Sequence, residues 1–313
     1  MTREVWDYPD HRPVLYQEVL NSLSPSSPGM YLDGTLGAGG HAKGILAACA
    51  PEGQLLGLDV DPFAISLATH RLESYASRCF IRQGSYAHSA DFLRELGWPG
   101  LDGALLDLGV SSMQLDHPER GFSFRQDGPL DMRFDSSQGP SAADLVNNLP
   151  EKELADIIWR YGEERFSRRV AKAIVHARPF ASTLALAEVV RKAVGRSQEK
   201  QDPATRTFQS LRIAVNDELK TIEQAIPGLI ALLKPHGRVA IISFHSLEDR
   251  LVKQAFQRES RDCGCPPEQP VCTCGHKALI RVLTHRPIMA TGQETTLNPR
   301  ARSARLRVAE RIN

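Results

Sequence analysis

The sequence Tyr-Leu-Asp-Gly-Thr-Leu-Gly-Ala-Gly-Gly-His at residues 31–41 is the stretch from which the fold can be predicted. Its first half has the apolar character of a buried strand, and a cluster of glycines follows at once. Residues 42–48 then place apolar side chains at helical spacing. A strand, a glycine turn and a helix form nucleotide-binding loops, because glycines allow close backbone approach and the helix start offers free N–H groups. Gly39 and Gly40 are therefore candidate cofactor-binding residues.

A second predicted strand, residues 54–59, ends in a carboxylate. Asp59 lies 20 residues after Gly39, which is about the distance at which an acidic residue binds the ribose hydroxyls of a nucleotide cofactor. The alternative is that Asp59 caps the helix that begins near Pro62. Asp61 directly precedes this proline and suits the cap better, so we assign Asp59 to a ribose.

Composition and charge set broad limits on the protein class. The chain has 313 residues, 42% of them hydrophobic, and a net charge of +1. This length allows one large domain or two medium ones, and the charge gives no global argument for nucleic-acid binding. The N-terminal residues lack the apolar core of a signal peptide, and no apolar run reaches membrane-spanning length. We expect a cytoplasmic protein with no membrane partner.

Strands alternate with helices through the first third of the chain. Further strands are predicted at residues 79–83 and 101–109, and both the order and the continuous apolar character favour an α/β fold with a parallel sheet. Residues 110–135 are rich in Ser, Asp, Gly and Pro, and this segment is too long for an ordinary connection, which favours a functional role.

The second half of the chain contains a predicted insertion. Residues 141–220 are mostly helical in pattern, and a helix over 206–233 is expected to break at Pro227. The sheet resumes at residues 237–244, and the last two strands are expected at 278–283 and 304–309. We therefore predict one domain from residues 1–115 and 216–313, and a helical domain, residues 116–215, inserted between the fourth and fifth strands.

Several candidate side chains follow the carboxyl ends of the predicted strands, where open α/β sheets bind ligands. Tyr86 suits an adenine ring or, equally, the start of a surface helix. Asp107 ends an apolar strand, where a carboxylate needs a polar partner, although a helix cap would also supply one. The glycine spacing is not that of a dinucleotide fold, which argues against a nicotinamide dehydrogenase and favours an adenosyl cofactor that carries a sulfonium.

Four of the six cysteines cluster near the C-terminal end of the chain, as Cys263-Gly-Cys265 and Cys272-Thr-Cys274. Four thiolates can hold a zinc ion, but Cys-x-Cys pairs are less typical of zinc sites than Cys-x-x-Cys pairs. Zinc binding, a labile disulfide and an inert thiol loop all stay open, and we assign no metal ligand.

The chain resembles the ribosomal RNA small subunit methyltransferase H family over nearly its whole length. The motifs that carry the resemblance occupy residues 33–41, 107–116, 120–124, 128–133, 161–166, 243–250 and 298–303. The resemblance implies a Rossmann-like class I methyltransferase sheet, S-adenosylmethionine as the methyl donor, and methylation of the exocyclic N4 amine of a cytidine in the decoding region of bacterial 16S rRNA. The cofactor contacts that it implies are Gly39, Gly40, His41, Asp59, Tyr86, Asp107 and Gln114. Without the resemblance, His41 would be assigned to a solvent-facing helix start and Gln114 to the general polarity of a loop.

The reaction implied is direct transfer of a methyl group from sulfur to nitrogen. The site must align a poorly nucleophilic amine with the methyl group and accept an amine hydrogen. Asp107 is the candidate catalytic residue, ranked first as a cofactor ligand, and the target base must leave its stack to reach it. His245 either lines the pocket or caps a helix.

RNA binding must rest on local charge. Residues 160–220 have six more basic than acidic side chains. Two basic groups are candidate phosphate-binding surfaces, with solvated helix faces as the alternative: Arg165, Arg168, Arg169, Lys172, Arg191, Lys192 and Arg196, and then Arg300, Arg302, Arg305 and Arg307. Phe122 and Phe124 could stack on RNA bases or fill a core.

The expected partner is small-subunit rRNA or the assembled small ribosomal subunit, and a homodimer is compatible with the sequence. A DNA amine methyltransferase is disfavoured, because Asp107 is followed by Leu-Gly-Val and not by two prolines and an aromatic residue. The alternative from another class is a non-enzymatic RNA-binding or ribosome-assembly factor with a vestigial cofactor crevice.

Overall fold

The computed structural model describes residues 13–195, 201–263, 265, 269, 271 and 273–312. The chain divides into two compact units. Unit 1 comprises Met1–Gly109 and Leu219–Asn313, and unit 2 is Val110–Glu218. The helical insertion predicted at residues 116–215 lies inside the range of unit 2.

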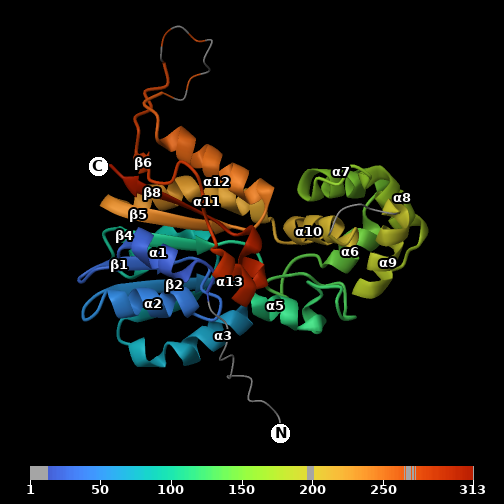
Figure 1. Ribbon diagram of the computed structural model, residues 1–313, viewed down its shortest axis with the longest axis horizontal. Coiled ribbons are helices and arrows are strands. Elements are labelled where there is room, and N and C mark those ends of the chain that lie inside the picture. Colours follow the sequence, from blue (N-terminus) through green and yellow to red (C-terminus); the bar gives the residue numbers. More distant parts are fainter. Residues whose placement is uncertain are drawn as a thin grey trace. The chain divides into compact units, whose positions relative to one another are not determined.

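Unit 1 is built on one twisted sheet with the strand order β3-β2-β1-β4-β5-β8-β6, and β7 pairs with β8 (Figure 1). Strands β1 to β5 are parallel to one another, while β8 runs antiparallel to β5, β6 and β7. The strands are β1 (Met30–Asp33), β2 (Gln54–Asp59), β3 (Cys79–Gln83), β4 (Leu101–Asp107), β5 (Leu233–Ser243), β6 (Ile280–Val282), β7 (Ile288–Met289) and β8 (Arg305–Arg311).

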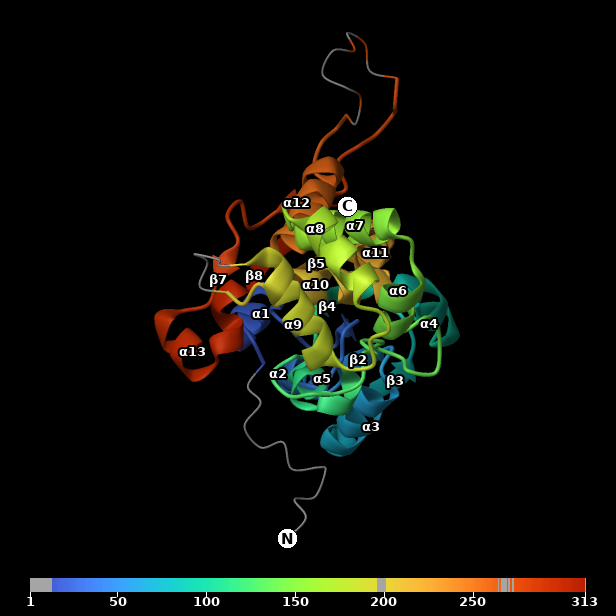
Figure 2. The same ribbon diagram turned by 90° about the vertical axis from the view of Figure 1, so that its right-hand side faces the viewer.

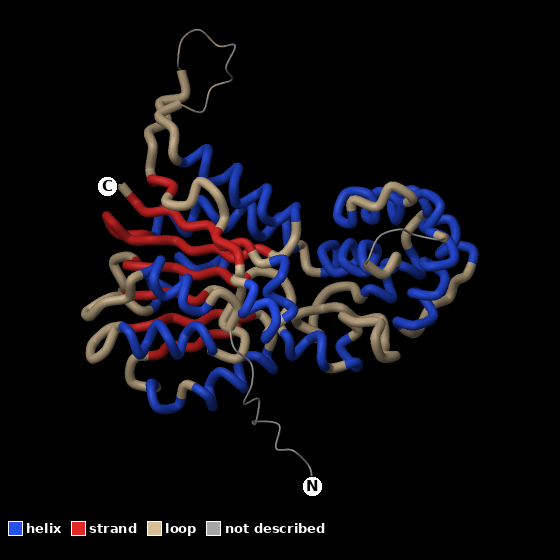
Figure 3. Tube along the Cα trace, in the orientation of Figure 1, coloured by secondary structure: helices blue, strands red, loops and turns tan. Residues whose placement is uncertain are grey.

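Helices cover both faces of this sheet, which explains why its strands lack polar alternation (Figure 3). In β4, Leu105 packs into the core beneath α1 (Tyr16–Leu23), α2 (Gly40–Ala48) and α3 (Pro62–Arg71). Its neighbour Leu106 packs into the opposite core, beneath α4 (Ser89–Glu95), α11 (Glu218–Leu232) and α12 (Ser246–Glu259). Successive residues of a strand therefore enter different cores.

Unit 2 has its own apolar core, formed mainly by helices. Helix α7 packs against α8 and α10, and α8 packs against α9 (Figure 2). The helices of this unit are α5 (Ser112–Asp116), α6 (Ala142–Asn148), α7 (Glu151–Gly162), α8 (Ser167–His176), α9 (Thr183–Val194) and α10 (Ala204–Val215). Phe122 is buried in this core and stacks on Phe134, so the core assignment holds for Phe122. Phe124 packs edge-on against Phe208.

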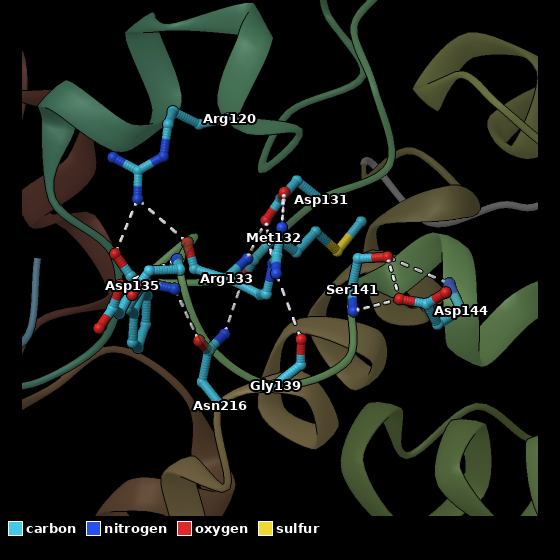
Figure 4. Close-up of polar contacts among 11 residues, drawn as sticks. Arg120, Asp131, Met132, Arg133, Asp135, Gly139, Ser141, Asp144 and Asn216 are labelled. Carbon is cyan, nitrogen blue, oxygen red and sulfur yellow. Dashed lines mark hydrogen bonds and ion pairs between the residues drawn. The ribbon is translucent and has the colours of Figure 1, made fainter.

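The Ser- and Gly-rich segment of unit 2 is fixed by polar side chains and is not an open loop (Figure 4). The Arg120 guanidinium donates to the carbonyls of Arg133 and Phe134, at 3.0 and 2.9 Å. The Asn216 amide donates to the Met132 carbonyl at 2.7 Å, and its oxygen accepts the Phe134 N–H at 2.8 Å. A half-buried Asn and an Arg thus replace the regular hydrogen bonds that this segment lacks.

The predicted break at Pro227 is wrong. The predicted helix is in fact two helices: one ends at Val215 and the next begins at Glu218. Between them, Asp217 adopts a positive φ of 49°. Pro227 lies within α11. The sequence analysis also missed β7 and α13 (Gly292–Leu297), which are too short for a periodic pattern. No helix among the described residues is long and apolar enough to span a bilayer.

Candidate active site

Three carboxylates end the three neighbouring strands β2, β1 and β4. Asp33 is opposite Gly57 and Leu105 in the sheet, so Asp59 and Asp107 each lie two residues further along their strands. Side chains two residues apart on a strand point to the same face. All three acids therefore share the face covered by α1, α2 and α3, at the edge where the parallel strands end.

Asp59 organises the glycine turn. Its Oδ2 accepts the Gly37 N–H at 2.8 Å, and its Oδ1 accepts the Asp61 N–H at 2.9 Å. Helix α3 is capped by Asp61, whose Oδ1 accepts the Phe63 N–H at 3.0 Å, so Asp61 and not Asp59 is the cap. Burial raises the pKa of Asp59 to about 6, against the lowering effect of these N–H groups.

Asp33 is a site residue that the sequence analysis missed. Its side chain is 1% exposed, and its Oδ1 accepts the Thr35 N–H at 3.2 Å. Burial raises its pKa to about 7, and the negative charge of Asp59 adds to this shift. The signal was present in the sequence, because Asp33 ends its strand as Asp59 and Asp107 end theirs.

Asp107 is the third acid of this group. Its pKa is raised well above the ordinary value, first by burial and then by the charges of Asp33 and Glu248. The side chain is 26% exposed, but its Oδ1 is buried and has no hydrogen-bond partner among the described residues. The backbone N–H of Asp107 donates to Thr35 Oγ1 at 2.6 Å, which holds the tip of β4 against the turn after β1. A buried carboxylate oxygen in this state is available to a ligand.

His41 lies in the first turn of α2 and faces this group of acids. Its Nε2 is 3.7 Å from Asp107 Oδ2, and its ring stacks on Tyr16 at 6.1 Å between centroids. The side chain is 5% exposed, so the solvent-facing alternative is wrong. Gly39 is the N-cap of α2 and has a φ of +77°, a conformation that favours glycine. A Cβ on Gly40 would lie 2.6 Å from Pro13 Cγ.

Tyr86 also lies near the strand tips. It begins a short 3₁₀ turn after β3, and a Cβ on Gly34, directly after β1, would lie 2.9 Å from Tyr86 Cβ. His245 is the N-cap of α12, where its Nδ1 accepts the Glu248 N–H at 3.4 Å. The cap alternative for His245 therefore holds, and Glu248 is a second acid that the sequence analysis missed.

Gln114 belongs to unit 2, whereas the other predicted cofactor contacts belong to unit 1. It is buried in the first turn of α5, where its Oε1 accepts the Ser111 N–H at 3.1 Å and its own N–H donates to Ser111 Oγ at 3.2 Å. This reciprocal cap fixes the start of α5.

The first basic group is mostly exposed on unit 2. Arg168 and Lys172 lie one turn apart on α8 and have no ion-pair partner among the described residues. Arg169 donates to the Val194 carbonyl at 2.6 Å, and Arg191 pairs with Asp202 at 2.9 Å. Both side chains therefore make polar contacts within unit 2. Arg196 lies outside the described residues.

The second basic group is partly internal to unit 1. Arg307 is buried and forms a two-pronged ion pair with Asp249, at 2.6 and 3.1 Å, and Arg305 contacts the same carboxylate at 3.1 Å. The assignment of Arg307 to a phosphate-binding surface is therefore wrong, whereas Arg305 keeps 41% of its side chain exposed and stays a candidate. Arg302 is exposed.

Replacing Asp33 by asparagine is expected to stabilise the fold at high pH. The folded state keeps the Asp33 proton up to a pH of about 7, whereas the unfolded chain releases it near 4, so wild-type stability falls as pH rises between these values. At ~1.4 kcal/mol per pKa unit, this shift lowers the free energy of unfolding of the wild type by at most about 4 kcal/mol at pH 8. Urea unfolding at pH 5 and pH 8 measures the difference, with the surface variant Asp91→Asn as control. An equal loss of stability with pH in wild type and Asp33→Asn would contradict it.

The fold and these strand-tip acids define the class of protein. A parallel sheet of order 3-2-1-4-5, extended by an antiparallel strand and with a glycine turn after its first strand, is that of a Rossmann-like class I methyltransferase. The model of the MraW methylase family matches residues 9–312, and the chain belongs to this family.

Curated relatives are similar over almost the whole chain. A protein named ribosomal RNA small subunit methyltransferase H from Geobacter sp. (strain M21) is 54% identical, covering 96% of this chain and 98% of the relative. One of the same name from Heliobacterium mobile is 48% identical, covering 96% and 99%. Among solved structures, an rRNA methylase from Streptococcus thermophilus is 10% identical with a TM-score of 0.43, and the match covers 95% of this chain and 95% of that one. We base no functional conclusion on a similarity this low.

Proposed function

We propose that this protein transfers a methyl group from S-adenosylmethionine to the exocyclic N4 amine of a cytidine in the decoding region of bacterial 16S rRNA. Membership of the MraW methylase family supports the reaction class, and the names of the full-length relatives support the RNA. The observation that carries the proposal is the row of acids at the tips of β2, β1 and β4, beside a glycine turn and a helix start.

The residues present fit an adenosyl sulfonium cofactor. Each Asp59 oxygen accepts one N–H and keeps a lone pair, so the carboxylate can still accept the two hydroxyls of a ribose. Asp33 and Asp107 are buried acids with raised pKa values, and a cation beside them favours their charged forms. When bound, S-adenosylmethionine supplies a cationic sulfonium and the methyl group that it carries. Gly39, Gly40, His41, Tyr86 and Gln114 complete the proposed cofactor contacts.

Asp107 has the properties required at the reacting end of this site. Its Oδ1 is buried without a hydrogen-bond partner among the described residues, so it can accept a hydrogen from the cytosine amine. That hydrogen bond aligns the amine and returns electron density to its nitrogen as the new bond forms. His41 Nε2 lies 3.7 Å from the other Asp107 oxygen, longer than a hydrogen bond, so His41 borders this carboxylate.

Unit 2 is the proposed RNA-recognition domain, and α8 its phosphate-binding face. Replacing Arg168 and Lys172 together by alanine is expected to make RNA affinity less dependent on salt. Each lost phosphate contact lowers the slope of log K against log salt by about 0.7 for single strands, or about 1.4 for the pair. Filter binding of rRNA fragments at several salt concentrations measures the slope.

The matched control for this pair is Arg94→Ala, an exposed arginine on α4 of unit 1. Its slope is expected to equal that of the wild type. If the double variant kept the wild-type slope as well, α8 would lie outside the RNA-binding surface.

The experiment that tests the proposed function is transfer of labelled methyl from S-adenosylmethionine to undermethylated small subunits, free 16S rRNA and duplex DNA. We expect N4-methylcytidine in the 16S rRNA, whether free or in the subunit, and no label in DNA. Binding of RNA with no transfer to any of the three would favour a non-enzymatic assembly factor instead.

A further inference from the structure

Three cysteine thiols converge in the segment, residues 260–279, that joins α12 to β6 in unit 1. The Sγ atoms of Cys263, Cys265 and Cys274 all lie within 4.8 Å of one another, and those of Cys263 and Cys274 are 3.9 Å apart. The described residues at the two ends of this segment run side by side, away from the end of α12 (Figure 1). The methyl transfer site does not use these cysteines.

The spacing of the sulfurs suits a shared metal ion. Four sulfurs around a tetrahedral zinc at about 2.3 Å lie about 3.8 Å from one another. The Sγ atoms of a disulfide are about 2.05 Å apart, and a disulfide joins two sulfurs, whereas three converge here. Thiolate ligands of this kind select zinc over the hard cations magnesium and calcium.

Two backbone N–H groups already point at the sulfurs. The Cys265 N–H donates to Cys263 Sγ at 3.4 Å, and the His276 N–H donates to Cys274 Sγ at 3.5 Å. In each case the donor lies two residues after the cysteine. Hydrogen bonds of this kind favour the charged thiolate and orient it towards a metal.

The segment has no apolar core to hold this arrangement. Its described residues between 260 and 279 are exposed or half-buried, and Val271 is 68% exposed. Its base is fixed by the Leu279 N–H, which donates to the Glu259 carbonyl at 2.8 Å, and by the His276 ring, which bonds the Arg258 carbonyl at 3.1 Å. Where a core cannot form, a bound ion is a usual source of stability.

We propose that Cys263, Cys265 and Cys274 bind one structural zinc ion, together with one further donor. Each thiol releases its proton to solvent as it binds the metal. The ion ties the two ends of the segment together and fixes it against α12.

The test is metal analysis of the full-length, tag-free protein purified without chelator. We expect about one zinc per chain in the wild type and none in Cys263→Ser or Cys274→Ser. Cys79→Ala, which removes a thiol from β3, is the matched control and is expected to keep the zinc. Cobalt added to the metal-free wild type is expected to give the visible absorption of a tetrahedral thiolate complex, and Cys263→Ser is expected to lose it.

Two results would overturn the proposal. One is wild-type protein without zinc after growth in zinc-supplemented medium, with its thiols free or joined as a disulfide by mass measurement. The other is stoichiometric zinc retained when all three cysteines are replaced by serine. Circular dichroism of each variant separates loss of metal from loss of the fold, and a folded serine variant without zinc supports the site.

Discussion

The Asp59→Ala variant is expected to bind S-adenosylmethionine about a hundredfold more weakly than the wild type. The alanine cannot accept the two ribose hydroxyls, and hydrogen bonds to a charged group contribute ~1.5–3 kcal/mol each. A loss of about 3 kcal/mol corresponds to a hundredfold change in Kd. Calorimetry with S-adenosylmethionine measures the effect, and RNA affinity should stay at the wild-type level.

The control for Asp59→Ala is Asp61→Ala, two residues away in the same turn. Asp59 accepts the N–H groups of Gly37 and Asp61, so its loss also loosens the turn. Asp61→Ala removes the cap of α3 but leaves the ribose carboxylate in place. Equal cofactor affinity in the two variants would remove the ribose assignment and leave Asp59 a structural role.

The pH dependence of cofactor binding gives an independent check on Asp59. Burial raises its pKa to about 6, so the carboxylate becomes protonated as pH falls through this value. Wild-type affinity is therefore expected to fall below pH 6. The difference between wild type and Asp59→Ala should shrink in the same range, because the protonated acid is a poorer acceptor.

The Asp107→Asn variant is expected to lower kcat by about 10²- to 10⁴-fold at saturating cofactor and RNA. An asparagine keeps the size of the side chain but is a weaker acceptor for the amine hydrogen. Single-turnover methyl transfer measures the loss. The wild-type rate should rise with pH as the raised pKa of Asp107 is passed, and the residual rate of the variant should not follow this rise.

The control for Asp107→Asn lies on the same strand. Asp102 is the second residue of β4, at the end opposite Asp107. It pairs with Lys234 at 2.6 Å, and Asp102→Asn should leave kcat within a few-fold of the wild type. A weaker cofactor affinity with an unchanged kcat in Asp107→Asn would make Asp107 a cofactor ligand alone.

The central part of the fold could be predicted from the sequence because its signals are local. Asp59 and Asp61 occupy the positions that the pattern assigned to a strand end and a helix cap, and only Asp61 caps the helix. The apolar runs of β2 and β4 predicted a sheet buried on both faces, and the two cores are found there. The parallel α/β sheet and the methyltransferase family are both confirmed.

Features that depend on distant contacts could not be predicted in this way. From the sequence, Arg307 is predicted to be a surface cation. In the fold β8 packs beside α12, and Asp249 of that helix forms a buried ion pair with Arg307. His41 is likewise predicted to be exposed, but in the fold it is buried, and its Nε2 lies 3.7 Å from Asp107 Oδ2 at the tip of β4. Helix α10 ends at Val215 and α11 begins at Glu218, with Asp217, a non-glycine residue of positive φ, between them, whereas local propensity points to a break at Pro227.

The division of unit 1 into two chain segments has a consequence for synthesis on the ribosome. Strand β4 gains its neighbour β5 only after all of Val110–Glu218 has been made. The all-helical contacts of α7 to α10 are close in sequence, so they can form while the nascent sheet still ends at β4. We therefore expect the inserted unit to become protease-resistant in nascent chains before the unit that flanks it in sequence. The middle of the chain would then fold before its two ends come together in unit 1.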